Sequence, residues 1–384
     1  MRRLGWAIGA LGALGALGAV ALGALVFALP ASRARDAAPA EADDAGRAQL
    51  LQQLRPPKRP RPLVAVLANN GGTETTDFIV PYGVLRASGV ADVFAVALRD
   101  EPVTLMPALR IRPQLDVGKF DAAYPEGADY VIVPAMHQSD DPGVTAWLSA
   151  QARAGATIVG ICDGAWVLGA AGLLDGRAAT SHWFSIARLR KSFPTMTWAE
   201  NRRYVVDRGV VTTTGVSASI PVSLTLVEAI AGRERAEQLA RELGVASFGA
   251  GHVSREFELD RPAVRTAALN TLAFWSHEAL DVPVSAGVDE VALALTADAY
   301  SRTYASSIRA VSSAPEVVSR NGLTFIADAP DPRPDPARAI PLPAEGVSAL
   351  DSALAGISRR YGPATADFVA LQLEYDRAVH VGAP

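Results

Sequence analysis

The chain of 384 residues contains one cysteine, Cys162, in a setting that is typical of a catalytic nucleophile. Residues 157–161, just before it, form an apolar and partly β-branched run that predicts a buried strand. Residues 164–171, just after it, are rich in small side chains and predict a helix. A cysteine between a strand and a helix lies on a tight turn, where the helix N-terminus stabilises a thiolate. We therefore predict a reactive thiol with a lowered pKa. The alternative is an ordinary small buried cysteine.

Other strands and helices must position this cysteine. Apolar runs at 63–68, 93–98 and 130–134 predict strands, and they alternate with helical patterns at 76–88 and 144–154. This alternation predicts an α/β fold, in which helices cover both faces of a mostly parallel sheet. Sites in such sheets form at the carboxyl ends of the strands. The polar residues that follow strands in this way are 69–77, 135–137 and 162–163.

The segment GICDGAWVLGAAGLLDGRAATSHW, residues 160–183, resembles the nucleophile elbow of the PfpI superfamily. That superfamily includes the Parkinson-linked DJ protein, isonitrile hydratases and the N-terminal domains of some AraC-type regulators, all on a class I glutamine amidotransferase-like fold. DFIVPY at 77–82 and TTGVS at 213–217 are supporting matches. The resemblance covers about residues 63–245 and implies a flavodoxin-like parallel sheet flanked by helices.

The resemblance also implies roles for residues around Cys162. Asp77 takes the place of a family carboxyl that contacts the cysteine sulfur and can act as an acid or a base. Its position also suits a helix N-cap, and the two roles can coexist. His182 corresponds to a histidine near the cysteine in some relatives, although a packed core histidine fits its position equally well. The remaining candidates, for backbone oxyanion binding or substrate contact, are Asp163, Ala135, Met136 and Trp183.

Two departures from the family pattern change the expected chemistry. Family proteases carry a histidine directly after the cysteine, but this chain has Asp163, and a neighbouring carboxylate raises the pKa of a thiol. The usual Gly-Gly after the Val-Pro strand is replaced by residues 135–137, which offer His137 as a substitute base. We therefore predict a hydratase or hydrolase that adds to a small electrophilic or carbonyl-like substrate, and not a protease. A ligand- or redox-sensing module without turnover is the alternative.

Charge and residue counts argue against several other classes. The formal net charge of -4 gives no basic surface for nucleic acid. One cysteine excludes an internal disulfide and a cysteine-rich zinc site, and the five histidines show no metal-ligand spacing. We therefore predict no metal and no cofactor. The expected partners are a small-molecule ligand and a membrane, and the sequence leaves a homo-oligomer open.

The N-terminal sequence predicts a single-pass membrane anchor. The uncharged stretch at 4–29 is long enough to span a bilayer as a helix, and it exceeds the apolar region of a usual signal peptide. A cleavage site at 32–34 is the alternative. Arg2 and Arg3 favour an N-terminus on the inner side, which places the soluble part on the extracytoplasmic side. A Pro- and Ala-rich linker at 30–62 follows the anchor.

Segments of the C-terminal third show weak sequence similarity to the PfpI-like domain at 63–245. We interpret residues 283–376 as a shortened, degenerate second copy that lacks the nucleophile segment. Between them, residues 246–282 form a linker and a helix. We expect that helix to run from 261 to 280 and to pack the two units together through an apolar stripe. The similar pairs of segments are 103–114 with 317–328, the helix near residue 77 with 291–300, and 220–232 with 350–362. The stripe consists of Leu269, Leu272 and Trp275.

Overall fold

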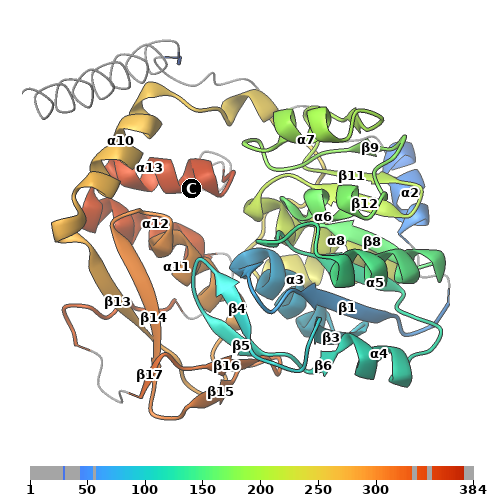
Figure 1. The fold of residues 1–384 in the computed structure, drawn as a ribbon, viewed down its shortest axis with the longest axis horizontal. Helices are drawn as coiled ribbons and strands as arrows, with labels where there is room; N and C mark the ends of the chain where they lie inside the picture. The colour runs from blue at the N-terminus through green and yellow to red at the C-terminus, as the bar shows by residue number, and fades with distance from the viewer. Residues whose placement is uncertain (1–28, 31–43, 55–57, 331–334, 344–347, 376–384) are drawn as a thin grey trace, which may run out of the picture.

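The structure is a computed structural model that describes residues 29–30, 44–54, 58–330, 335–343 and 348–375 (Figure 1). The predicted anchor at 4–29 therefore lies outside the described residues, except for Leu29. Of the helices in the described part of the chain, none has the length and apolar character needed to cross a membrane. Figure 1 shows two units side by side, which we call the first unit (residues 44–54 and 58–245) and the second unit (residues 261–375).

A seven-stranded sheet forms the centre of the first unit. Its strands are β1 (Leu63–Ala68), β3 (Asp92–Ala97), β6 (Leu115–Asp116), β7 (Tyr130–Val133), β8 (Thr157–Gly160), β11 (Tyr204–Asp207) and β12 (Val210–Thr213). They lie in the order β11-β12-β8-β7-β1-β3-β6, and every neighbouring pair is parallel except β11 with β12. The prediction of an α/β, flavodoxin-like fold with a mostly parallel sheet is confirmed.

Helices cover both faces of this sheet. Along β1, alternate residues belong to two different apolar clusters, because successive side chains of a strand point to opposite faces. Val64 and Val66 pack with α3 and α8, while Ala65 and Leu67 pack with α4 to α7. The helices are α2 (Asp44–Gln53), α3 (Thr75–Ser88), α4 (Val117–Ala123), α5 (Pro142–Arg153), α6 (Gly164–Ala170), α7 (Ile186–Ser192), α8 (Ser219–Ala231) and α9 (Arg233–Glu242). The short strands are β9 (Ala178–Ala179) and β10 (Thr197–Trp198).

The second unit has a smaller parallel sheet. Its strands lie in the order β13-β14-β17, with bounds Glu278–Pro283, Ser306–Ser312 and Ala329–Pro330. Its helices are α10 (Arg261–Leu272), α11 (Glu290–Ser301), α12 (Ser348–Tyr361) and α13 (Pro363–Gln372). The helix expected over 261–280 ends at Leu272, since residues 278–283 pair with β14 instead.

The predicted packing role of the apolar stripe on α10 is wrong. Leu269, Leu272 and Trp275 are 55%, 67% and 78% exposed, so they do not join the two units. The contact is made elsewhere, by α3 against α11 and by a five-stranded sheet in the order β15-β16-β5-β4-β2. The bounds of those strands are β2 (Thr73–Glu74), β4 (Val103–Met106), β5 (Arg110–Arg112), β15 (Glu316–Val318) and β16 (Thr324–Ile326).

A glycine allows the two helices of this contact to approach closely. A Cβ on Gly83 of α3 would lie 2.7 Å from a methyl carbon of Val291 and 2.9 Å from a carboxylate oxygen of Glu290, both on α11. Beside them, the hydroxyl of Tyr82 donates a hydrogen bond of 3.2 Å to the carbonyl of Asn321. The two units therefore share a tightly packed, mostly buried interface rather than a loose tether.

Candidate active site

Cys162 lies on a sharp turn between β8 and α6. Its φ is 54°, in the left-handed region that non-glycine residues seldom occupy. Thr213, at the end of β12, accepts the amide of Cys162 at 3.0 Å, and the hydroxyl of Ser181 donates to the Cys162 carbonyl at 3.2 Å. A Cβ on Gly164 would lie 2.1 Å from the carbonyl oxygen of Val133, so only glycine fits there. The surrounding backbone therefore holds the elbow at the carboxyl edge of the sheet.

Asp77 lies in the first turn of α3 and is fully buried. The N-cap of this helix is Glu74, whose carboxylate accepts the Asp77 amide at 2.6 Å. Oδ2 of Asp77 accepts the Ala135 amide at 3.2 Å, whereas Oδ1 has no hydrogen-bond partner among the described residues. Burial raises the pKa of Asp77 to about 8, because a carboxylate loses its hydration there. A buried carboxyl with an unused oxygen can take up or release a proton near neutral pH.

The surroundings of the Cys162 thiol favour its neutral form. Burial raises the pKa of this thiol well above its ordinary value, and Asp77, Asp163 and Glu74 raise it further. Arg302 acts in the opposite direction. The result is the reverse of the lowered pKa expected from the helix N-terminus. The reason is that α6 has only seven residues, and desolvation together with three carboxyl groups outweighs its dipole.

The second unit contributes an arginine to this site. Arg302 directly follows α11, and its guanidinium pairs with Glu74 at 2.6 Å and with Asp298 at 2.7 Å. Asp298 is fully buried and also accepts the hydroxyl of Thr76 at 2.8 Å. Burial opposes the charge on Arg302, but the two carboxyl groups outweigh this effect and raise its pKa. Acids of both units and a cation of the second unit therefore form one network beside Cys162.

Glu74, Asp298 and Arg302 were not among the site residues predicted from the sequence. Glu74 carried a weak signal, because it lies two residues before the helix predicted at 76–88, and acidic residues are favoured near a helix N-terminus. Arg302 lies 228 positions from Glu74 along the chain, and no spacing rule links such distant residues. Only the docking of α11 against α3 brings them together.

His137 and His182, the two candidate bases, are not hydrogen-bonded to Cys162 or to Asp77. The side chain of His137 is exposed and makes no hydrogen bond within the described part of the chain. Nε2 of His182 lies 2.9 Å from the carbonyl of Gln372, and its Nδ1 accepts a backbone amide at 3.3 Å. Nε1 of Trp183 donates to the carbonyl of Leu371 at 2.9 Å. His182 and Trp183 therefore hold the end of the second unit, and neither is hydrogen-bonded to the thiol.

The backbone amides considered for an oxyanion hole differ in their availability. The amide of Ala135 already donates to Asp77. Met136 pairs with Thr73 in an isolated bridge, whose hydrogen bonds use the Ala135 carbonyl and the His137 amide. The Met136 amide therefore lies outside that ladder and is the better candidate of the two.

Asp163 replaces the histidine that follows the cysteine in family proteases, and its carboxylate is held by two serines. It accepts the hydroxyl of Ser181 at 3.1 Å and that of Ser185 at 2.6 Å, one on each oxygen. Both oxygens of Asp163 therefore accept hydrogen bonds, whereas Oδ1 of Asp77 accepts none from the described residues. Its backbone amide, at the N-terminus of α6, is the second candidate for oxyanion binding.

Residues 371–375, which we call the C-terminal segment, lie against the first unit next to this site. The carboxylate of Glu374 accepts the amide of Gly215 at 2.6 Å, two residues after β12. The side-chain amide of Gln372 donates to the carbonyl of Arg302 at 2.9 Å. The C-terminal segment thus contacts both the backbone after β12, next to the elbow, and the backbone of Arg302.

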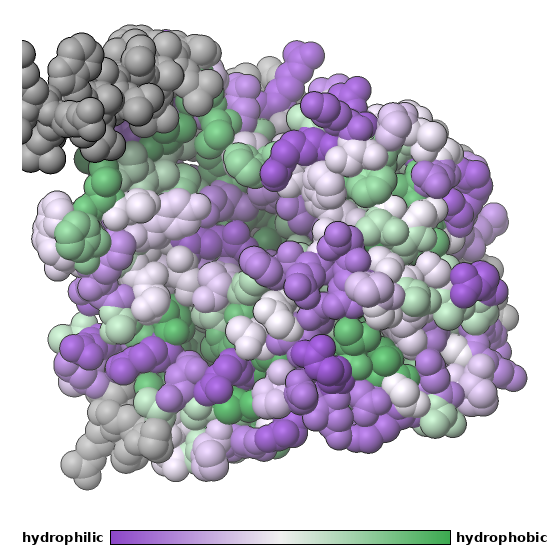
Figure 2. Space-filling view, in the orientation of Figure 1, coloured by the Kyte–Doolittle hydropathy of each residue, from purple (hydrophilic) through white to green (hydrophobic). Residues whose placement is uncertain are grey.

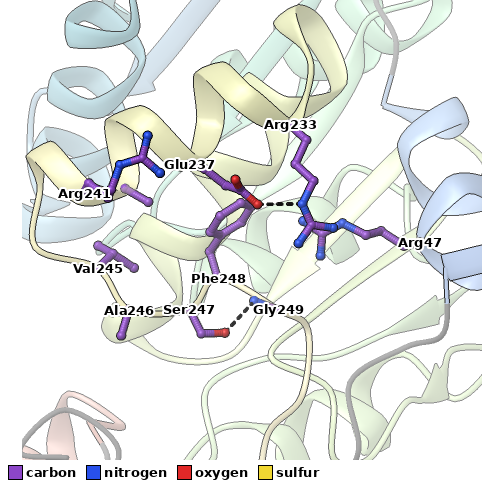
Figure 3. A pocket seen from close by; sticks show the side chains of 10 residues that line it. Arg47, Arg233, Glu237, Arg241, Val245, Ala246, Ser247, Phe248 and Gly249 are labelled. Carbon is purple, nitrogen blue, oxygen red and sulfur yellow. Dashed lines mark hydrogen bonds and ion pairs between the residues drawn. The ribbon is translucent and has the colours of Figure 1, made fainter.

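A cavity of about 430 Å³ lies elsewhere, between α2, α9 and the loop after α9 (Figure 3). Arg47, Arg233 and Arg241 line it together with Glu237. The Nε of Arg233 and Oε1 of Glu237 form an ion pair at 2.6 Å. The guanidinium of Arg47 lies 5.3 Å above the ring of Phe248. No lining residue belongs to the Cys162 network, so this cavity is separate from the candidate active site.

The elbow and its carboxyl residue fall in a part of the chain that matches a known family. The model of the DJ-1/PfpI family matches residues 63–229. The isonitrile hydratase of Pseudomonas putida is 30% identical over 175 residues, which are 44% of this chain and 73% of that protein. The chain belongs to the DJ-1/PfpI family.

Other relatives match over shorter stretches or at lower identity. Protein dj-1beta of Drosophila melanogaster is 25% identical over 182 residues, 46% of this chain and 93% of that protein. Its crystal structure matches with a TM-score of 0.44 at 23% identity, covering 49% of this chain and 100% of that one. The HTH-type transcriptional regulator GbdR of Pseudomonas aeruginosa is 36% identical over 94 residues. The chain spans about a quarter of that regulator, since the match covers 24% of it.

Proposed function

We propose that this protein is a cysteine-dependent enzyme of the hydratase or hydrolase type, acting on a small electrophilic or carbonyl-like substrate. The observation that carries the proposal is the pairing of Cys162 with Asp77. Among the charged groups near the thiol, Asp77 has the largest effect on its pKa, and Oδ1 of Asp77 is unused. A thiol kept neutral beside a carboxyl that titrates at about pH 8 suits chemistry in which both groups exchange a proton.

The proposed reaction adds water in two steps. The carboxylate of Asp77 takes the thiol proton, and the sulfur of Cys162 forms a bond to the electrophilic carbon. Asp77 then gives this proton to the substrate atom that gains charge. Water attacks the same carbon and passes a proton to Asp77, the carbon–sulfur bond breaks, and the sulfur regains its proton from Asp77. In this proposal the Met136 and Asp163 amides bind the negative charge that develops on a carbonyl-like oxygen.

We further propose that the second unit is a degenerate copy of the first that completes this site. The support is the shared order of elements: β13-β14-β17 repeats β1-β3-β6, α11 follows β13 as α3 follows β1, and the hairpin β15–β16 follows β14 as β4–β5 follows β3. Within its described residues the second unit has no counterpart of β7, β8 or α6. In this role it supplies Arg302, which offsets the negative charge of the acids around the thiol.

A ligand-binding module without turnover is the second candidate. It is favoured by the similarity to GbdR, a protein named as a transcriptional regulator. Redox sensing fits less well, because sensor cysteines are accessible and have a low pKa, whereas Cys162 is buried with a raised pKa.

We also propose that residues 4–29 tether the chain to a membrane and leave the two units on the extracytoplasmic side. The support is the sequence: an uncharged stretch long enough to span a bilayer follows Arg2 and Arg3.

The test measures iodoacetamide alkylation of Cys162 and turnover of small electrophiles, isonitriles first, against pH on the full chain. We expect wild-type alkylation to have a midpoint above the ordinary thiol value of about 8.5. Turnover should rise with pH through about 8, as Asp77 becomes able to accept the thiol proton. Asp77→Asn should lower the alkylation midpoint, because a negative charge is lost. Turnover should be abolished in Asp77→Asn and also in Cys162→Ser.

Asp163→Asn is the matched control. It removes a second charge that raises the thiol pKa, so it too should lower the alkylation midpoint. It should keep turnover, because the oxygens of Asp163 are bonded to serines and carry no proton in the proposed reaction. If saturable binding occurs without any Cys162-dependent turnover, the binding module is the correct function.

A further inference from the structure

Four large apolar side chains are exposed together at one end of the second unit. Leu269 and Leu272, at the end of α10, are 55% and 67% exposed, and Phe274 and Trp275, in the turn that follows, are 72% and 78% exposed. We call these four residues the α10 patch. Figure 2 shows hydrophobic side chains over α10 at the upper left edge of the molecule. Such a cluster of exposed large apolar side chains marks a contact surface.

The patch continues an exposed face of α10 that also carries Arg265. Arg265, Leu269 and Leu272 are exposed and recur at spacings of four and three, which places them on one stripe of the helix. The opposite face carries Ala263 and Thr266, which are buried. The helix therefore packs one face against the protein and turns Leu269 and Leu272 outward.

Residues 29–30, where the uncharged stretch ends, contact the start of this same helix. The side chain of Arg261, the first residue of α10, donates to the carbonyl of Leu29 at 3.1 Å. The amide of Arg261 donates to the carbonyl of Pro30 at 3.1 Å. The uncharged stretch at 4–29 thus ends at the N-terminus of the helix whose C-terminal end carries the α10 patch.

We propose that the α10 patch lies in the lipid–water interface and forms a second membrane contact, which rests on the tether proposed above. A bilayer spanned by residues 4–29 would lie next to the start of α10, and a helix of this length reaches about 18 Å along its surface. Leucine, phenylalanine and tryptophan side chains partition into the interface, and the stem of Arg265 allows its charge to reach anionic headgroups. The contact holds the second unit, and with it Arg302, at a fixed orientation to the membrane.

The test uses the full chain in vesicles of phosphatidylcholine with a minor share of phosphatidylglycerol. In a Cys162→Ser background, an environment-sensitive fluorophore is attached through Leu272→Cys. Val318→Cys is the matched control, because Val318 is also apolar and 53% exposed but lies on β15 at the opposite end of the second unit (Figure 1). Flotation with the vesicles is measured in parallel, so that a failed tether is recognised separately.

We expect brominated lipids to quench the probe at 272 several-fold more than the probe at 318, and its emission to shift to the blue. Leu269→Ser and Trp275→Ser, added together, should reduce that quenching while flotation is unchanged. Equal quenching at both positions in a chain that floats would overturn the inference and leave the tether standing. A probe at 272 shielded from water but not quenched by lipid would also overturn it, since residues 4–28 or a second copy would then cover the patch. A chain that does not float would overturn both.

Discussion

The two units of this protein share an order of strands and helices, but the nucleophile of the site comes from the first and its cation, Arg302, from the second. In the first unit the sheet continues beyond β1 through β7 and β8 to Cys162, and the nearby acids Asp77 and Glu74 are buried. In the second unit the sheet of the described residues ends after three strands, and the residue after α11 is Arg302. The nucleophile therefore needs one unit, whereas the charge balance around it needs both.

The largest expected effect comes from removing the contribution of the second unit. Arg302→Met leaves Glu74 and the fully buried Asp298 without their counter-charge. Breaking a buried ion pair on one side typically costs about 3–5 kcal/mol, because the remaining charge stays desolvated. We expect a loss of this size in the free energy of unfolding in urea, together with a higher midpoint for Cys162 alkylation, since Arg302 is the group that lowers the thiol pKa.

Arg112→Met is the control for this variant. Arg112 also forms an ion pair between the units, with Glu316, but its side chain is 49% exposed and that of Glu316 is 40% exposed. Water and salt screen such a pair, so the change in unfolding free energy should be much smaller, and the alkylation midpoint should not move. Equal effects of the two variants would mean that Arg302 only joins the units and does not tune the site.

The sheet of the first unit could be predicted because its determinants are local. Apolar runs such as 63–68 and 157–161 have strand length and alternate with helical patterns, and the structure places strands at Leu63–Ala68 and Thr157–Gly160. The same local reasoning failed for α10. Its stripe at 269–275 has helical spacing, but spacing alone does not show whether an apolar face meets protein or another phase.

The site was predictable only where its residues lie close in sequence or in a recognised motif. Cys162 and Asp77 come from such motifs, whereas Arg302 enters from a unit whose docking no local pattern encodes. The direction of the thiol pKa was missed for the same reason, since the helix N-terminus was visible in the sequence but the desolvation and Glu74 were not.

The next effect is the pH dependence of the unfolding free energy that the buried Asp77 causes. The pKa of Asp77 is about 8 in the folded protein and near the ordinary value of about 3.9 in the unfolded chain. The folded state therefore holds the proton more tightly, and the stability contributed by Asp77 is complete below about pH 4 and is lost as the pH rises through 8. We expect the unfolding free energy of the wild type to fall by a few kcal/mol more than that of Asp77→Asn over this interval.

Asparagine keeps the geometry of this test, because its side-chain oxygen can still accept the Ala135 amide. Urea unfolding of both proteins at several pH values gives the difference directly, and the effect of Glu74, whose pKa burial also raises, largely cancels between them. Parallel pH profiles for the two proteins would show that Asp77 is ionised at neutral pH, which would remove the proton from the proposed reaction.

The smallest expected effect comes from a hydroxyl at the elbow. Thr213 forms a hydrogen bond there, whereas the buried Thr296 of the second unit forms none with the described residues. Thr213→Val deprives the buried Cys162 amide of its acceptor and should cost about 1–2 kcal/mol of unfolding free energy. Thr213→Ser keeps the oxygen and should cost less. In the second unit, the buried hydroxyl of Thr296 has no hydrogen-bond partner among the described residues, so Thr296→Val should be neutral or stabilising. Cys162 alkylation should accelerate only in Thr213→Val, because that change alone loosens the left-handed turn. An equal cost for both valine variants would assign the loss to shape rather than to the hydrogen bond that holds the elbow.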